Sequence, residues 1–165
     1  MTTVDLGAQS LREAFGTFPT GVVAVCGLDS TGTPVGMAVS TFVPVSLEPP
    51  LVGICLQQAS RTWPVLRKMT TLGISVLGSE HRDVARQLAA REGDRFAGMT
   101  TSVTDRGAVH LAGSPTLFEC ALEQEFEAGD HVIAVLRVLT VDFEPEAQPL
   151  LFHRSRFAEV SSASA

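Results

Sequence analysis

The chain has 165 residues, of which 45% are hydrophobic, with a formal charge of −6 and a positive mean hydropathy. These values predict one acidic domain with a well-developed core, leave no need for a second domain, and argue against a nucleic-acid binder. The apolar runs are too short and too often interrupted to cross a bilayer, and the N-terminus lacks a basic and then apolar signal. We therefore expect a cytoplasmic protein.

The first predicted elements are a helix and a strand. Between residues 5 and 18, apolar side chains recur at helical spacing, and Asp5 or Ser10 is the expected cap. The nearly continuous β-branched run at 22–28 then predicts a strand covered on both faces. The apolar positions of the predicted helix are Leu11, Ala14, Phe15 and Phe18.

A turn-rich segment at 29–33 predicts a hairpin that pairs the strand at 22–28 with a second strand at 35–42. The stretch 36–50 mixes β-prone side chains with hydroxyls that strand packing does not require, so it predicts a ligand-facing strand and the loop after it. Two consecutive prolines at 49–50 are expected to end the strand pairing, because proline has no amide hydrogen.

The segment 57–64 follows a predicted buried strand at 51–56 and combines amides, hydroxyls and a guanidinium ahead of a helix. Ser60 is the expected N-cap and Thr62 is expected in the first turn, so backbone amides, two hydroxyls and Arg61 could converge on a phosphate. The alternative is a capped helix with a solvated arginine, which the spacing alone favours.

The next segments predict a strand at 71–77 and a helix at 79–91, with most of the helix charges on a solvated face and Gly93 at its end. The pattern at 99–112 is weak and predicts a loop with an uncertain strand. The apolar face of the helix comprises Val84, Ala85, Leu88 and Ala89.

Two long β-like runs at 116–127 and 132–143, joined by a Gly-Asp turn, predict a hairpin, and short strands follow at 149–153 and 156–160. Residues 161–165 are expected to be a disordered tail, which leaves one domain at 1–160. Roughly seven strands with few helices and no strand–helix alternation predict a mainly β, barrel-like fold with helical additions.

Several common chemistries have no motif in this sequence. The glycine-rich dinucleotide and P-loop fingerprints and the Gly-x-Ser-x-Gly elbow are missing, and the four histidines lack metal-ligand spacing. The odd number of cysteines, each within an apolar run, indicates reduced thiols and not a disulfide framework. These cysteines are Cys26, Cys55 and Cys120.

Short motifs in the same order over almost the whole chain resemble the short-chain flavin reductase family, the FMN-binding split-barrel proteins that reduce free flavin with NADH or NADPH. The chain departs from the family at Val39 and Pro44, where a small residue and serine are more usual, and at His153 and Phe157, where tyrosines are usual. The matching segments are Phe18-Pro19-Thr20-Gly21-Val22, Pro34-Val35-Gly36-Met37, Ser46-Leu47-Glu48-Pro49-Pro50-Leu51-Val52, Ser60-Arg61-Thr62, Arg95-Phe96-Ala97-Gly98, Gly129-Asp130-His131 and Pro149-Leu150-Leu151-Phe152.

The resemblance implies the fold of an FMN-binding split β-barrel with Greek-key topology and a set of cofactor contacts. At Ser60-Arg61-Thr62, where spacing alone favours a capped helix with a solvated arginine, the resemblance instead favours a binding site for the flavin phosphate. The nicotinamide is assigned to His131, Arg154 and Phe157, with His131 as a positioning residue and no acid–base catalyst. Arg154 and Arg156 are candidates for binding the phosphates of the pyridine nucleotide, although on an acidic surface they could equally be solubilising charges. Arg95 and Phe96 could rim the flavin site or merely anchor a loop. The implied flavin contacts are Met37, Ala38, Val39, Ser40, Thr41, Cys55, Leu56, Gln57, Ser60, Arg61, Thr62, Arg95 and Phe96.

The implied activity is hydride transfer from NADH or NADPH to FMN or FAD, by a homodimer that supplies reduced flavin to a partner monooxygenase. Two alternatives stay open. One is a split-barrel enzyme that holds FMN tightly and reduces another acceptor. The other is a non-catalytic flavin-binding dimer or a barrel that has lost its cofactor, for which Val39 and Pro44 are the first suspects.

Overall fold

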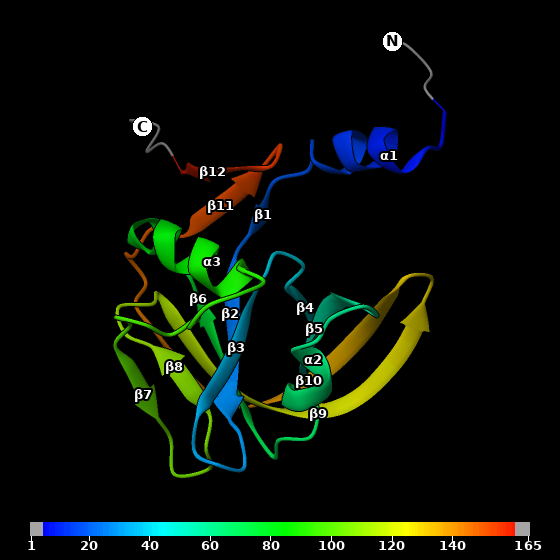
Figure 1. The fold of residues 1–165 in the computed structure, drawn as a ribbon. Helices are drawn as coiled ribbons and strands as arrows, with labels where there is room; N and C mark the ends of the chain where they lie inside the picture. Colours follow the sequence, from blue (N-terminus) through cyan, green and yellow to red (C-terminus); the bar gives the residue numbers. More distant parts are fainter. Residues whose placement is uncertain (1–4, 161–165) are drawn as a thin grey trace.

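The structure is a computed structural model that describes residues 5–160, so the predicted tail at 161–165 lies outside the described residues. Strands dominate, as predicted (Figure 1). No helix within residues 5–160 is long and apolar enough to span a membrane. The elements are α1 Ala8–Phe15, β1 Thr20–Gly21, β2 Val23–Leu28, β3 Pro34–Val39, β4 Val43–Leu47, β5 Pro50–Gln57, α2 Trp63–Leu66, β6 Leu72–Val76, the 3-10 helix η1 Ser79–His81, α3 Arg82–Ala89, β7 Thr101–Val103, β8 Val109–Leu111, β9 Thr116–Ala128, β10 His131–Phe143, β11 Leu150–His153 and β12 Arg156–Glu159.

Seven strands form one antiparallel sheet in the order β3-β2-β6-β9-β10-β5-β4. Two smaller sheets, β1-β11-β12 and β7-β8, complete the strand pairing. The long β9–β10 hairpin curves beneath α2 and carries the sheet around toward β5 and β4 (Figure 1). As a result β3 and β4, which are joined by a short connection at residues 40–42, are the two edges of the same sheet.

The core lies on both sides of β2, which explains its continuous apolar sequence. Val23 and Val25 belong to one buried cluster, while Ala24 and Cys26 belong to another. Successive side chains of a strand point to opposite faces, so a strand between two clusters must be apolar at every position. The prediction of a strand covered on both faces is therefore confirmed.

The predicted hairpin at 116–143 is confirmed as β9 and β10, with Gly129 at φ +63° in the turn. His131 is the first residue of β10 and pairs with Gln57 of β5, so it belongs to the sheet and not to the turn. The closing strands β11 and β12 also lie where they were predicted.

Three predictions about the first half of the chain need correction. The helix expected at 5–18 is α1, which spans only eight residues and buries none of them; its N-cap is Gly7, and Asp5 instead accepts a hydrogen bond from the Gly7 amide. The strand expected at 35–42 ends at Val39, and a separate edge strand, β4, follows it. Pro50 does not end the pairing: it begins β5 opposite Leu47, a position where a strand tolerates proline.

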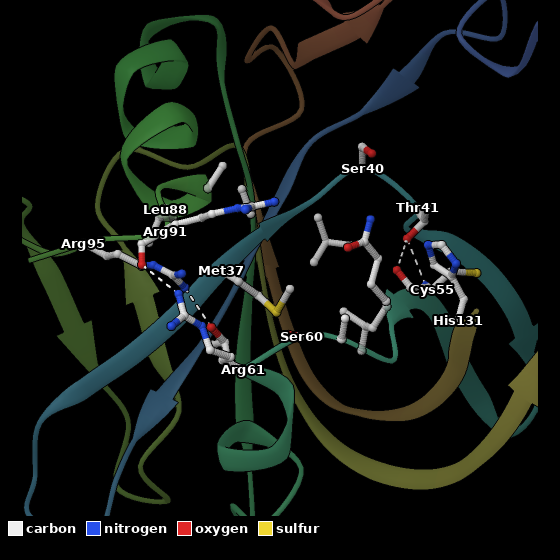
Figure 2. Close-up of a pocket in the computed structure, with 17 residues that line it drawn as sticks. Met37, Ser40, Thr41, Cys55, Ser60, Arg61, Leu88, Arg91, Arg95 and His131 are labelled. Carbon is white, nitrogen blue, oxygen red and sulfur yellow. Dashed lines mark hydrogen bonds between the residues drawn. The ribbon is translucent and has the colours of Figure 1, made fainter. Parts of the chain in front are cut away.

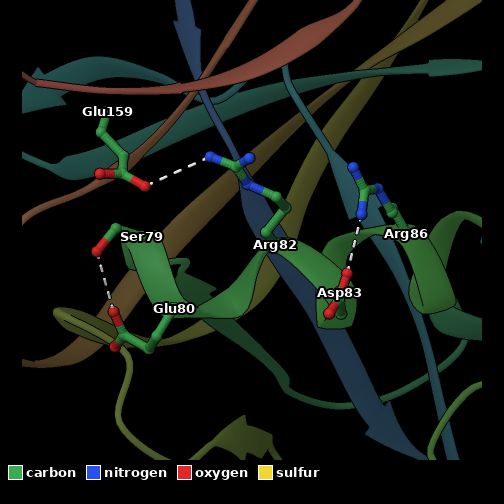
Figure 3. A network of polar contacts seen from close by, with 6 residues as sticks. All are labelled: Ser79, Glu80, Arg82, Asp83, Arg86 and Glu159. Atoms are coloured by element: carbon green, nitrogen blue, oxygen red, sulfur yellow. Dashed lines mark hydrogen bonds and ion pairs between the residues drawn. The ribbon is translucent and has the colours of Figure 1, made fainter.

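Two further predictions need correction after residue 78. The helix expected at 79–91 consists of η1 and α3 and ends at Ala89, and α3 is tied to its surroundings by a surface network (Figure 3). In this network Arg82 lies 3.3 Å from Glu159 of β12, and Arg86 lies 2.9 Å from Asp83. The weakly patterned region 99–112, predicted as a loop with an uncertain strand, contains two paired three-residue strands, β7 and β8. Such short strands leave too few residues for an alternation to be visible.

Candidate functional site

A cavity of about 800 Å³ opens between β3, β5 and the segment around α3 (Figure 2). Ligand pockets typically have volumes of several hundred Å³, so a drug-sized molecule can enter it. Four segments that are far apart in sequence line it, and the lining residues are Met37, Ala38, Val39, Ser40, Thr41, Cys55, Leu56, Gln57, Ala59, Ser60, Arg61, Thr62, Leu88, Ala89, Arg91, Arg95 and His131.

The cavity lies where the seven-stranded sheet is left unpaired. β5 pairs with β10 along its length on one side, but on its other side β4 pairs only with its first four residues. The Thr41 hydroxyl then donates to the Cys55 carbonyl and accepts from the Cys55 amide, both at 2.9 Å. A side chain thus takes the place of a strand partner, and the Thr41 hydroxyl hydrogen is not available to a ligand.

The backbone of Gln57 faces this unpaired side. Amide directions alternate along a strand: the Cys55 amide points toward Thr41, and the Gln58 amide donates to the Asp130 carbonyl on the β10 side. The Gln57 amide therefore points away from β10, into the opening. It is a backbone donor placed at the wall of the cavity.

The predicted phosphate segment is at the cavity, but the helix that follows it is short. Ser60 does cap, since its hydroxyl oxygen accepts from the Trp63 amide at 3.1 Å. α2, however, has only four residues, and Thr62 is its N-cap residue instead of part of its first turn. The Thr62 hydroxyl oxygen accepts from Arg95 at 2.8 Å. Both hydroxyl hydrogens therefore remain to be donated to an anion.

Three arginines and no carboxylate line the cavity within the described chain, although the protein has a net charge of −6. Arg95 is committed to the protein: it donates to the carbonyls of Ala90 at 2.8 Å and Gly36 at 3.1 Å, besides Thr62. Arg61 donates to the Arg91 carbonyl at 3.2 Å. The cavity is thus a local positive region suited to an anionic ligand.

His131 lies at the opposite rim of the cavity from these arginines (Figure 2). Its Nδ1 is 2.7 Å from a carboxylate oxygen of Asp130, and this hydrogen bond lowers the pKa of Asp130. An ionised carboxylate only accepts, so Nδ1 carries the hydrogen and Nε2 is left for another partner. The imidazole is therefore oriented by its neighbour.

Comparison with known proteins decides the family. The sequence model of the family described as flavin reductase like domain matches residues 15–161. The chain belongs to this family.

Individual relatives agree with the family assignment. The chain is 37% identical over 154 residues to an actinorhodin polyketide dimerase of Streptomyces coelicolor, covering 93% of this chain and 87% of the relative. It is 34% identical over 152 residues to the reductase subunit of a flavin-dependent monooxygenase of Rhodococcus jostii, covering 92% and 77%.

The fold agrees as well. An NADH:FAD oxidoreductase of Streptomyces globisporus, solved in complex with NAD and FAD fragments, superposes with a TM-score of 0.93 at 33% identity over 100% of both chains. The mainly β split-barrel fold that was predicted is thereby confirmed.

Three of the residues assigned to cofactors lie away from the cavity in this flavin reductase-like chain. Phe96 packs behind β3, where its ring would lie 2.9 Å from a Cβ added at Gly36. Phe157 contacts Phe152 edge to face, with ring centroids 5.5 Å apart. Arg154 borders a second cavity of about 390 Å³ beside α1. The single chain therefore does not bring Arg154 and Phe157 together with His131.

Four lining residues are not among those expected from the sequence: Ala59, Leu88, Ala89 and Arg91. Leu88 and Ala89 were expected on the apolar face of a helix, but the sequence does not show that α3 packs beside β3. Arg91 was included among the solvated charges. Its position beyond the end of α3 places it at the cavity because α3 itself lies there (Figure 2).

The three cysteines differ in exposure. Burial raises the pKa of Cys26 and of Cys120 to about 12, so both are inert thiols near neutral pH. Cys55 is partly exposed and lines the cavity. All three are free, as predicted.

Proposed function

We propose that this chain is an NAD(P)H:flavin oxidoreductase that binds flavin in the 800 Å³ cavity. The observation that carries the proposal is the pairing of a largely uncharged strand wall with an arginine-rich end free of carboxylates. A flavin nucleotide has the same division, with a flat ring system at one end and phosphate at the other. Membership of the flavin reductase-like family supports the same conclusion.

The protein residues have binding and orienting roles. Ser60, Thr62 and Arg61 supply donors for the flavin phosphate, while Arg95 holds Thr62 in place. Met37 and the backbone of β3 and β5 form the wall against the ring system. His131 orients the nicotinamide from the opposite rim. The chemistry that bound flavin supplies is acceptance of a hydride from nicotinamide, which needs no acid or base from this wall.

FMN or FAD is the proposed flavin, and NADH or NADPH the proposed reductant. The structure of the Streptomyces globisporus NADH:FAD oxidoreductase in complex with NAD and FAD fragments supports this assignment. The relative that is a monooxygenase reductase subunit supports the further proposal that reduced flavin passes to a partner monooxygenase.

A homodimer is also part of the proposal. β4 is an edge strand of the large sheet, yet Val43, Val45 and Leu47 on it are 51%, 51% and 94% exposed. An apolar edge strand favours association with another chain. We propose that residues 1–160 form the single domain of each protomer, in the cytoplasm, where three free thiols suit the reducing conditions. Gel filtration with light scattering gives the oligomeric state.

One experiment separates the proposed activity from its alternatives. Purified protein is mixed with NADH and increasing FMN, and the loss of nicotinamide absorbance is followed. A rate that rises with added flavin supports a reductase that uses flavin as a substrate. Protein that stays yellow through dialysis, and oxidises NADH no faster with added FMN, would be the tightly bound flavoenzyme. Protein that binds no flavin would be a scaffold only.

A further inference from the structure

Arg91 lines the cavity but is not among the residues proposed to bind the single phosphate of FMN. Ser60, Thr62 and Arg61 already offer two hydroxyls and a guanidinium to one phosphate. Arg95, the third cavity arginine, donates hydrogen bonds to three oxygen atoms of the protein. Arg91 is therefore an additional positive charge at the arginine-lined end of the cavity, beyond the groups proposed to bind one phosphate.

The side chain of Arg91 has no acceptor among the residues that the structure describes. Its backbone carbonyl accepts a hydrogen bond from Arg61 at 3.2 Å, which fixes the two residues side by side. Figure 2 shows the Arg91 side chain extending from the end of α3 into the cavity, away from that carbonyl. No carboxylate lines this part of the chain's cavity to neutralise it.

Arg61 and Arg91 thus place two cations in the same part of the cavity, with their side chains extending in different directions, which suits an anion that has more than one charged group. FMN has one phosphate, which the Ser60–Thr62 segment can hold. FAD has two phosphates joined by a single bridging oxygen, so the second is held next to the first. Guanidinium groups bind phosphate oxygens through charge-assisted, often paired, hydrogen bonds.

We propose that Arg91 binds the second phosphate of FAD and so determines the preference of this site for FAD over FMN. The inference rests on the proposed flavin reductase function and deepens it by naming the flavin and the residue that selects it. Arg61 acts on the phosphate that both flavins share, whereas Arg91 acts only on the phosphate that FAD adds.

The test compares Arg91→Ala, Arg91→Lys and wild type in their Kd for riboflavin, FMN and FAD, measured by quenching of flavin fluorescence. Arg91→Ala is expected to weaken FAD about tenfold and to leave the Kd of FMN and riboflavin within about twofold. Arg91→Lys is expected to fall between wild type and Arg91→Ala for FAD, because it keeps the charge and loses the paired donors. Arg82→Ala, which removes an arginine from the opposite end of α3, is the matched control and should change none of the three.

Other results would overturn the inference in distinguishable ways. Equal weakening of FMN and FAD by Arg91→Ala would assign Arg91 to the shared phosphate. An unchanged FAD affinity with a raised KM for NADH would assign it to the nicotinamide nucleotide, and no change in any ligand would make it a solvated charge. If wild type bound neither FMN nor FAD, both the proposed function and this inference would be wrong. If wild type reduced flavin but the Arg91 variants had unchanged Kd values for FAD, only this inference would be wrong. Because the Arg91 side chain is exposed, thermal melts should show that the variants remain folded.

Discussion

The assignment of flavin phosphate to the Ser60–Thr62 segment predicts a selective loss in the double variant Ser60→Ala, Arg61→Ala. This variant removes one hydroxyl and one guanidinium that border the cavity. FMN should bind much more weakly, while riboflavin, which has the same ring system but no phosphate, should bind with little change. The comparison isolates the phosphate because both ligands use the same β3 and β5 wall.

The size of the loss follows from the number of contacts removed. A hydrogen bond to a charged group contributes roughly 1.5–3 kcal/mol, and exposed Arg61 belongs at or below the low end because solvent screens it. The two contacts together give about 2–3 kcal/mol, which corresponds to a roughly 30- to 150-fold rise in the Kd of FMN. Riboflavin should stay within about twofold.

The assay is titration of protein into flavin with fluorescence detection at fixed ionic strength, since the contribution of Arg61 falls as salt rises. Ser60→Ala also removes the cap on the Trp63 amide, so each variant is melted first, and a stability loss of about 1 kcal/mol is expected. The double variant Ser79→Ala, Arg82→Ala changes the same residue types in the surface network of Figure 3 and should leave FMN binding unchanged. Equal weakening of FMN and riboflavin would refute the phosphate assignment.

Three further predictions concern the wall of the cavity. Thr41→Val should lower the free energy of unfolding by about 1–2 kcal/mol and the Tm by roughly 2–8 °C, because it removes the hydroxyl that bonds both backbone groups of Cys55. Thr41→Ser keeps the hydroxyl and should melt near wild type. Equal Tm values for the three proteins would contradict this role of the hydroxyl. At pH 8 Ellman's reagent should modify Cys55 in the native protein, because the thiolate is the reactive form and Cys55 is partly exposed. Cys26 and Cys120, whose pKa is raised by burial to about 12, should react only in denaturant. Rapid labelling of all three thiols in the native protein would contradict this prediction. Flavin should slow hydrogen exchange at the Gln57 amide more than at amides that already pair with β10, and the site is misplaced if exchange there does not change.

Elements with a long, repeated signal could be predicted from the sequence. The hairpin at 116–143 has two long runs and a Gly-Asp turn, and it forms β9 and β10 almost to the residue. The apolar run at 22–28 predicted a strand covered on both faces, because a strand that is packed on both faces must be apolar at every position. The region of the three-residue strands β7 and β8 was predicted only as a loop with an uncertain strand, because so short a segment cannot show a period.

The candidate site was predictable where one segment contributes several residues and unpredictable where a single residue depends on packing. The stretches 37–41, 55–57 and 60–62 were assigned through a resemblance to a family, and all of them line the cavity. Arg91 could not be found in this way, because an arginine at a helix end faces solvent or a cavity according to what the helix packs against. The engagement of the Thr41 hydroxyl with Cys55 likewise depends on a contact between residues 14 positions apart.

The position of the site follows from the way the sheet is closed. β3 and β4 are its two edges, and only residues 40–42 connect them, so the chain must cross from one edge to the other there. The crossing leaves the second half of β5 without a strand partner on the side opposite β10, and unpaired backbone donors beside an apolar core are costly unless something satisfies them. Thr41 satisfies the backbone of Cys55, which leaves the Gln57 amide directed into the cavity. In the proposed flavin site, this break in the strand pairing would supply a backbone hydrogen-bond donor for the edge of the ring system, and the arginines beyond α3 and before α2 would supply positive charge for the phosphate end.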